Sequence, residues 1–212
     1  MKKITAILLS LMLLLSAAAL GEAADEKLTL GTISINGEFT LRCGIPEGYE
    51  YTPIYAGQEQ VIAMFSSRED PQAPSMMLSV AFDETYSDVD RMNDLDEEAL
   101  ALLEQTYIED DPEVEITTGE TGYGTLLMIA KHDTEDMDYL AFLSIYKGYF
   151  VEFVLIPSEE AVDKNLTEDQ MRVSIDFLTE LDFVPVTAGA DQAAQAEAET
   201  AEEPEEESTE AN

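Results

Sequence analysis

The densest group of side chains that could do chemistry lies between residues 83 and 96. Its carboxylates are Asp83, Glu84, Asp88, Asp90, Asp94 and Asp96. Carboxylate oxygens are the ligands that calcium takes, several at a time. The stretch does not fit an EF-hand loop, because the glycine is missing and Met92 falls on a ligand position. We therefore expect no resident cofactor and no selective metal site. Weak divalent cation association is expected instead, with Asp88, Asp90 and Asp94 as the candidate ligands.

Other side chains that could take part in a reaction lack the neighbours that an enzyme site needs. His132 is the only histidine and has acidic neighbours, but nothing positions a nucleophile or a second ligand beside it. We expect it to be solvated at a strand end. Ser144 and Lys147 match S-x-x-K in spacing, yet they fall on a predicted strand and its turn rather than on a helix. Residues 119–124 are glycine-rich, and we expect a hairpin turn there instead of a phosphate cradle. The sequence predicts no catalytic residue.

Net charge restricts the partners. The chain has 46 acidic and 10 basic residues, a formal charge of −36. Removing one acid and two lysines in residues 1–24, and nine acids in residues 187–212, leaves 36 acids against 8 bases, about −28. Such a field repels nucleic acid and anionic membrane surfaces. It is compatible with cations, with basic partners, or with solubility alone.

The two ends of the chain are predicted to lie outside the fold. Residues 1–24 have a basic start, an apolar run and small residues, which is the layout of a cleaved signal peptide. An uncleaved anchor is the alternative, although the apolar run is short for spanning a bilayer. No cysteine ends the run, so a lipoprotein is not expected, and the protein is predicted to be secreted or on the cell exterior. Residues 25–34 are expected to be a lead-in to the domain, and residues 28–35 an early strand or part of that lead-in. Residues 187–212 contain no aromatic residue and are predicted to be a disordered acidic tail.

The element that must organise the fold is the stretch 139–156. It reads as two strands joined by a turn at Lys147 and Gly148, with Tyr146 facing Tyr149. Both faces are apolar except for Ser144 and Glu152, so the hairpin should lie inside a sheet that is covered on both sides. In this register Glu152 lies opposite Leu143. We expect Glu152 to meet a donor or to reach the sheet margin, because an unpaired buried carboxylate is costly.

The other predicted elements flank this hairpin. Strands are predicted at residues 38–43, 61–65, 76–82, 113–117 and 126–130 from alternating or continuous apolar runs. A first helix should begin at a capping box of Asp94 and Glu97. Its stripe is predicted to be Leu95, Ala99, Leu102, Leu103 and Thr106. A second helix should begin at Thr167 with Gln170. Its stripe is predicted to be Met171, Ile175, Leu178 and Leu181. Cys43, the only cysteine, should face the core.

Two motifs resemble those of PsbP-like domains. Residues 38–41 lead into Ile45-Pro46-Glu47-Gly48-Tyr49, and residues 149–153 are followed by a loop, a helix and Leu181-Asp182-Phe183. The resemblance covers about Ile35 to Val184. It implies a single α+β domain, residues 35–186, with an antiparallel sheet and helices packed on both faces (an α/β/α sandwich). No functional motif of that family is matched here, so the resemblance implies no site residue.

These observations favour an exported, non-enzymatic domain with a binding or structural role at the cell exterior. Its partner would be an unknown protein or small ligand, not nucleic acid and not an anionic membrane surface. Two alternatives stay open: a hydrolase-type enzyme whose site is assembled from scattered carboxylates, and a calcium-binding surface domain. A pocket that gathers two carboxylates with raised pKa values would favour the enzyme.

Overall fold

The computed structural model describes residues 28–57, 60–134, 137–161 and 163–186. Within these residues the chain forms ten strands, two α-helices and two short 3-10 helices. The elements in chain order are β1 (Leu28–Ile35), β2 (Phe39–Pro46), β3 (Tyr49–Ala56), β4 (Gln60–Ser67), β5 (Ser75–Phe82), η1 (Glu84–Tyr86), η2 (Met92–Asp94), α2 (Glu97–Asp110), β6 (Glu115–Glu120), β7 (Leu126–Asp133), β8 (Asp138–Tyr146), β9 (Tyr149–Ile156), α3 (Glu168–Thr179) and β10 (Asp182–Pro185). The predicted signal peptide and acidic tail lie outside the described residues.

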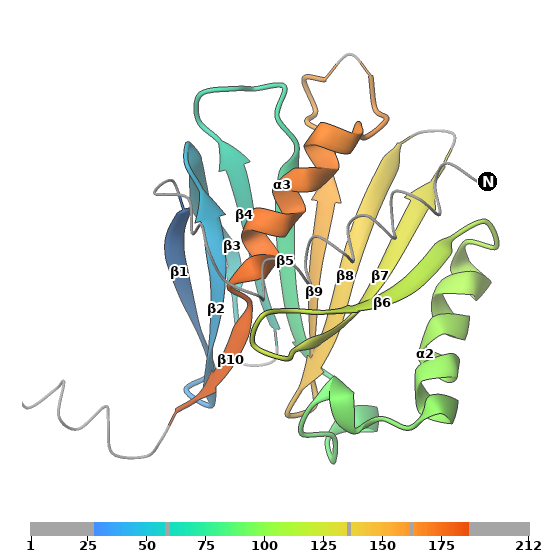
Figure 1. The fold of residues 1–212 in the computed structure, drawn as a ribbon. Coiled ribbons are helices and arrows are strands. Elements are labelled where there is room, and N and C mark those ends of the chain that lie inside the picture. The colour runs from blue at the N-terminus through green and yellow to red at the C-terminus, as the bar shows by residue number, and fades with distance from the viewer. Residues whose placement is uncertain (1–27, 58–59, 135–136, 162, 187–212) are drawn as a thin grey trace, which may run out of the picture.

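The strands form two antiparallel sheets (Figure 1). The larger has seven strands in the order β3-β4-β5-β9-β8-β7-β6, and the smaller has three in the order β1-β2-β10. The predicted hairpin, β8 and β9, lies in the interior of the large sheet, as expected. Its register is confirmed, with Tyr146 opposite Tyr149 and Leu143 opposite Glu152.

The β8–β9 turn takes the backbone conformation that its sequence allows. Lys147 has φ 51° and Gly148 has φ 76°, so both turn residues are left-handed. Two such residues match the right-handed twist of the flanking strands, which makes this the favoured two-residue hairpin turn. Residues outside the hairpin also hold the turn. The Lys147 amide donates to the Asp90 carbonyl, and the Gly148 amide donates to the Val89 carbonyl.

One face of the large sheet is covered by the small sheet together with α3. Side chains from this face pack with Phe39 and Leu41 of β2 and with Phe177 and Leu178 of α3 in one buried cluster. In Figure 1, α3 runs across the middle of the large sheet, and the small sheet lies at its β3 end. The α+β class is therefore confirmed. The expected layering of helix, sheet and helix is not shown, because a second sheet supplies much of this covering layer.

The opposite face packs against α2 over part of its width. Leu103 of α2 and Met92 of η2 are buried against Met128, Leu143 and Ile145 of the sheet. In Figure 1, α2 stands beside the β6 and β7 end of the large sheet. The two-sided burial predicted for the hairpin is thus supported, with different partners on its two faces.

One edge strand was expected from the sequence and another was not. Residues 28–35 form a full strand, β1, which pairs with β2 along its length and confirms the early strand expected there. Residues 49–56 form β3, which the sequence did not predict. No residue of β3 is fully buried, because β3 is the edge strand of the large sheet and has a register shift between Pro53 and Tyr55. A strand without a buried face has no alternating apolar pattern to detect.

The second helix begins where the sequence indicated. The Thr167 hydroxyl accepts from the Gln170 amide, and the Gln170 side chain accepts from the Thr167 amide, which completes the predicted capping box. Met171, Leu178 and Leu181 are buried as expected. Ile175 is only half-buried, and Phe177, outside the predicted stripe, is fully buried instead.

Cys43 faces the core, as predicted, with no exposed surface. Burial raises the pKa of its thiol to about 12. Because the thiolate is the reactive form, native protein should react with an aromatic disulfide reagent at least about 100-fold more slowly than protein unfolded in urea. The two labelling rates, measured at pH 8, check this. Equal labelling rates would show that the Cys43 thiol is accessible to the reagent in the native protein.

No helix in the described part of the chain is long and apolar enough to cross a bilayer.

Candidate functional site

A hollow of about 500 Å³ opens between α2 and the sheet face that carries Glu152. Its lining residues come from the η1 segment, α2 and β9: Asp83, Thr85, Tyr86, Leu103, Thr106, Tyr107, Phe150 and Glu152. The hollow combines an apolar and aromatic wall with two carboxylates and two threonine hydroxyls, so polar and apolar side chains line it in similar proportion.

Glu152 is the charged group on the β9 side of the hollow. The Tyr107 hydroxyl donates to Glu152 Oε1 at 2.6 Å. Burial, and then the neighbouring Glu152 carboxylate, raise the pKa of Tyr107 well above its usual range, so Tyr107 stays a protonated donor. The expectation that Glu152 meets a donor is confirmed. The carboxylate is half-buried and remains a hydrogen-bond acceptor at the hollow.

Tyr107 reaches Glu152 because of the helical frame of α2. The helix begins at Glu97, and the Asp96 carboxylate caps it by accepting from the Ala99 amide at 2.9 Å. Leu103 and Tyr107 then lie four residues apart on the buried side. The predicted capping box of Asp94 and Glu97 is wrong, because Asp94 accepts from the Arg91 amide and belongs to η2.

The buried stripe of α2 is confirmed only in part. Leu103 is buried as predicted, whereas Leu102 is 64% exposed, and Leu100 and Tyr107, outside the predicted stripe, pack on the buried side. Sequence reasoning therefore missed Tyr107 as a site residue. The signal was present in the spacing of Tyr107 four residues after Leu103, on the same helical face.

His132 is buried beside the hollow, and the expectation that it is solvated is wrong. Its side chain is 3% exposed, its Nδ1 lies 2.9 Å from Asp111 Oδ2, and its ring stacks on Tyr139 with centroids 4.2 Å apart. Asp111 closes the C-terminal end of α2. The pair therefore attaches that end of the helix to β7, and neither residue lines the hollow.

The cation candidates are not gathered into one site. Asp90 and Asp94 line a shallow hollow of about 370 Å³ that they share with Arg91 and Lys147, and Asp88 is not among its lining residues. The Asp94 carboxylate already accepts from the Arg91 amide. Two basic side chains at the same place disfavour a cation. Across the described ranges, no three histidine, cysteine or acidic side chains are arranged to hold a metal ion.

A second group of buried charges lies at the far end of β7 and β8. Asp138 and Lys131 are 6% and 7% exposed, and Lys131 Nζ lies 3.6 Å from Asp133 Oδ2. Burial, and then the nearby Asp133 carboxylate, raise the pKa of Asp138, while Lys131 partly opposes this. Asp138 Oδ1 is buried and has no partner among the described residues. The fold therefore favours the protonated form of Asp138.

This raised pKa predicts a pH-dependent stability. A carboxyl whose folded-state pKa exceeds its unfolded value stabilises the fold below the unfolded pKa, and that contribution is lost as pH rises through the folded pKa. Asp138→Asn should therefore flatten the fall in Tm between about pH 4 and pH 7 and should not lower Tm at pH 7. Asp88→Asn, an exposed match, should leave the slope unchanged. An unaltered slope in Asp138→Asn would show that Asp138 ionises as it does in the unfolded chain.

Comparison with known proteins returns no match among family models, curated proteins or solved structures. The geometry of the hollow is therefore the basis on which a function can be proposed. Of its residues, the sequence had singled out Glu152 and the acidic Asp83. The structure brings both to one hollow with Tyr107 and Phe150.

Proposed function

We propose that this protein is an exported, non-enzymatic binding domain whose hollow takes a positively charged group attached to an apolar one. The observation that carries the proposal is the Glu152 carboxylate, held by Tyr107 at 2.6 Å in a hollow walled by Leu103, Tyr86 and Phe150. A carboxylate fixed by a neutral donor keeps its charge available to a cation, and the rings of Tyr86 and Phe150, packed edge to face with centroids 4.9 Å apart, supply the aromatic wall beside it.

The charge of the domain supports a cationic ligand. Residues 25–186 carry 36 acids against 8 bases, and such a field concentrates cations near the surface and speeds their association. Export is proposed from the leader sequence, and the PsbP-like relationship from the motifs at residues 38–49 and 149–183. The layering that the PsbP-like relationship implies, with helices packed on both faces of the sheet, is proposed together with that relationship.

Binding is favoured over catalysis even though the hollow holds two carboxylates. Asp83 accepts from the Thr85 amide at 2.8 Å and caps η1, and Glu152 Oε1 accepts from Tyr107. The residues that line the hollow include no histidine, cysteine or lysine. A general acid–base mechanism needs a pair of groups that exchange protons with a substrate, and Tyr107, the donor beside Glu152, is held in its protonated form.

Titration with benzylammonium, a small probe that joins a cation to a ring, tests the proposal. We expect a dissociation constant on the order of millimolar, with NMR shifts centred on Tyr107, Phe150 and Glu152. Glu152→Gln should weaken binding about tenfold, since it removes the fixed charge but keeps the shape. Glu69→Gln removes one exposed charge elsewhere and should have little effect. Equal weakening in both variants, or shifts spread over the whole surface, would mean that benzylammonium only follows the general field.

A further inference from the structure

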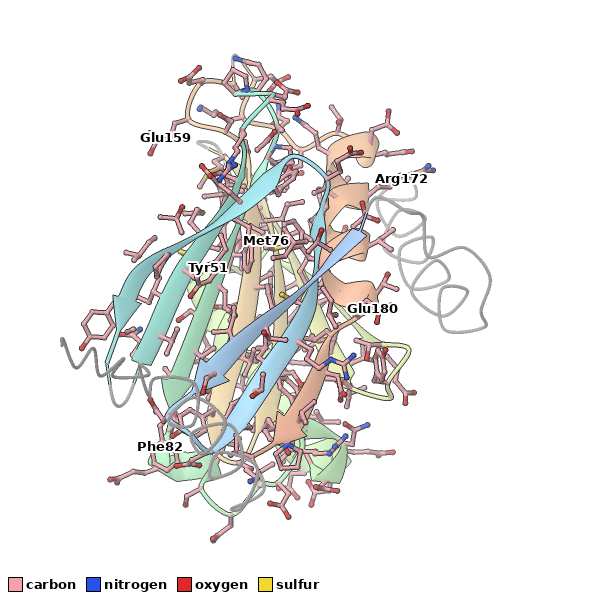
Figure 2. All side chains as sticks on the ribbon, turned by 90° about the vertical axis from the view of Figure 1, so that its left-hand side faces the viewer. Tyr51, Met76, Phe82, Glu159, Arg172 and Glu180 are labelled. Atoms are coloured by element: carbon pink, nitrogen blue, oxygen red, sulfur yellow. The ribbon has the colours of Figure 1, made fainter. Side chains whose placement is uncertain are left out.

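The large sheet has an open area on the same face as the hollow. Along β4 and β5, the residues that face α3 are fully buried, whereas Ile62, Met64 and Met77 on the other face are only half-buried. Tyr55, beside them on β3, is 53% exposed. Ile62 and Met64 belong to none of the buried clusters that the described residues form. In Figure 2, α3 lies on one side of these strands, and side chains project from the other.

Strand register connects this area to the hollow. Ile62 lies opposite Ser79, and Ser79 lies opposite Glu152 on the next strand. In the adjacent row, Met64 lies opposite Met77. Neighbouring strands are about 4.8 Å apart, so the row from Ile62 reaches Glu152 over about 10 Å. Ser79 is therefore the one residue between the apolar side chains of β4 and the carboxylate of the hollow along this row. We call Tyr55, Ile62, Met64 and Met77 the open strip.

The negative charge of the domain restricts what can bind over the open strip. A second copy of the domain would bring another net charge of about −28, and residues 187–212 carry nine acids and no base. Both would be repelled. Glu152 lies at one end of the strip, whereas Glu50 on β3 is already paired with Arg68. A ligand with an apolar face and a basic residue at the Glu152 end matches this distribution of charge.

The width of the strip favours a helix. β3, β4 and β5 together span about 10–14 Å, which is close to the 10–12 Å diameter of an α-helix with its side chains. The other half of the same face already holds a helix, α2, through Leu103 and Tyr107. Two adjacent methionines suit a surface that adapts to a partner helix, because the side chain is flexible and polarisable.

We propose that the open strip binds a basic amphipathic helix of a partner protein, beside α2, and that a lysine or arginine of that helix enters the hollow and meets Glu152. The second part of this inference rests on the proposed function. The first part rests on the open strip alone. The partner helix would extend the layer that α2 begins over this face of the sheet.

A synthetic leucine–lysine peptide with all its leucines on one helical face serves as the probe, and a peptide of the same composition in scrambled order serves as its control. Fluorescence anisotropy at physiological salt gives the affinities. Met64→Gln with Met77→Gln keeps side-chain length but removes apolar surface, and should weaken binding about tenfold or more. Leu102→Gln with Ile108→Gln alters two exposed apolar residues of α2, at 64% and 46% exposure, and should change affinity less than about twofold.

The outcomes separate the two proposals. Equal effects of the two double variants, or equal binding of the scrambled peptide, would overturn helix docking on the open strip. So would self-association of the protein that the Met64 and Met77 changes abolish, because the strip would then bind a second copy. Benzylammonium binding should be insensitive to those changes. If Glu152→Gln affects neither benzylammonium nor the peptide while the methionine variant still weakens the peptide, docking stands and the function proposed for the hollow is overturned.

Discussion

Gly148→Ala is expected to lower the free energy of unfolding by about 2–4 kcal/mol. Gly148 has φ 76°, a conformation that costs an L-residue about 1–2 kcal/mol. A Cβ at this position would also lie 3.0 Å from Ser87 Cα and 3.3 Å from the Tyr86 carbonyl oxygen. These are backbone atoms of a segment tied to the turn, because the Asp83 amide donates to the Gly148 carbonyl and the Gly148 amide donates to the Val89 carbonyl. The segment therefore cannot move aside without loss of those bonds.

Gly37→Ala is the matched control. Gly37 has φ 72° in the turn between β1 and β2, and a Cβ there would have no neighbour within 4 Å. The conformational cost alone should apply, about 1 kcal/mol. Urea denaturation of both variants gives the comparison. Equal losses of unfolding free energy in the two variants would show that the segment beneath the β8–β9 turn moves aside without cost. The turn would then not be held by that segment.

Phe177→Ala should cost about 3–5 kcal/mol, the usual range for a fully buried phenylalanine. Phe177 has no exposed surface, and its ring lies 5.4 Å from that of Tyr49 and 5.2 Å from that of Phe65. It joins α3 to β3 and β4, so its loss leaves a cavity between the helix and the sheet. Thermal and urea unfolding, monitored by circular dichroism, measure the cost.

Ile175→Ala distinguishes the structure from the sequence pattern. The helical stripe read from the sequence contains Ile175 and omits Phe177, whereas the structure leaves Ile175 half-buried. We expect a loss of about 1–2 kcal/mol for Ile175→Ala, because partly exposed side chains lose less transfer free energy. A larger loss for Ile175→Ala than for Phe177→Ala would mean that α3 turns the side carrying Ile175, and not the side carrying Phe177, toward the sheet.

Local patterns determined the central part of this protein. The β8–β9 hairpin, its turn and its register followed from an apolar run with one glycine and one internal charge, because a strand has a side-chain period of two and a tight turn fixes the pairing. The Thr167 capping box likewise depends on residues three apart in the chain. The expectation that Glu152 needs a donor followed from the cost of burying a carboxylate.

Tertiary structure alone decided the identity of that donor and the shape of the site. Tyr107 meets Glu152 across 45 residues of sequence, and His132 meets Asp111 across 21. No local pattern encodes such pairs, since they depend on how α2 is rotated against the sheet. The edge strand β3 and the second sheet were also decided at this level. An edge strand buries little, and the choice of pairing partner among strands depends on contacts distant in the chain.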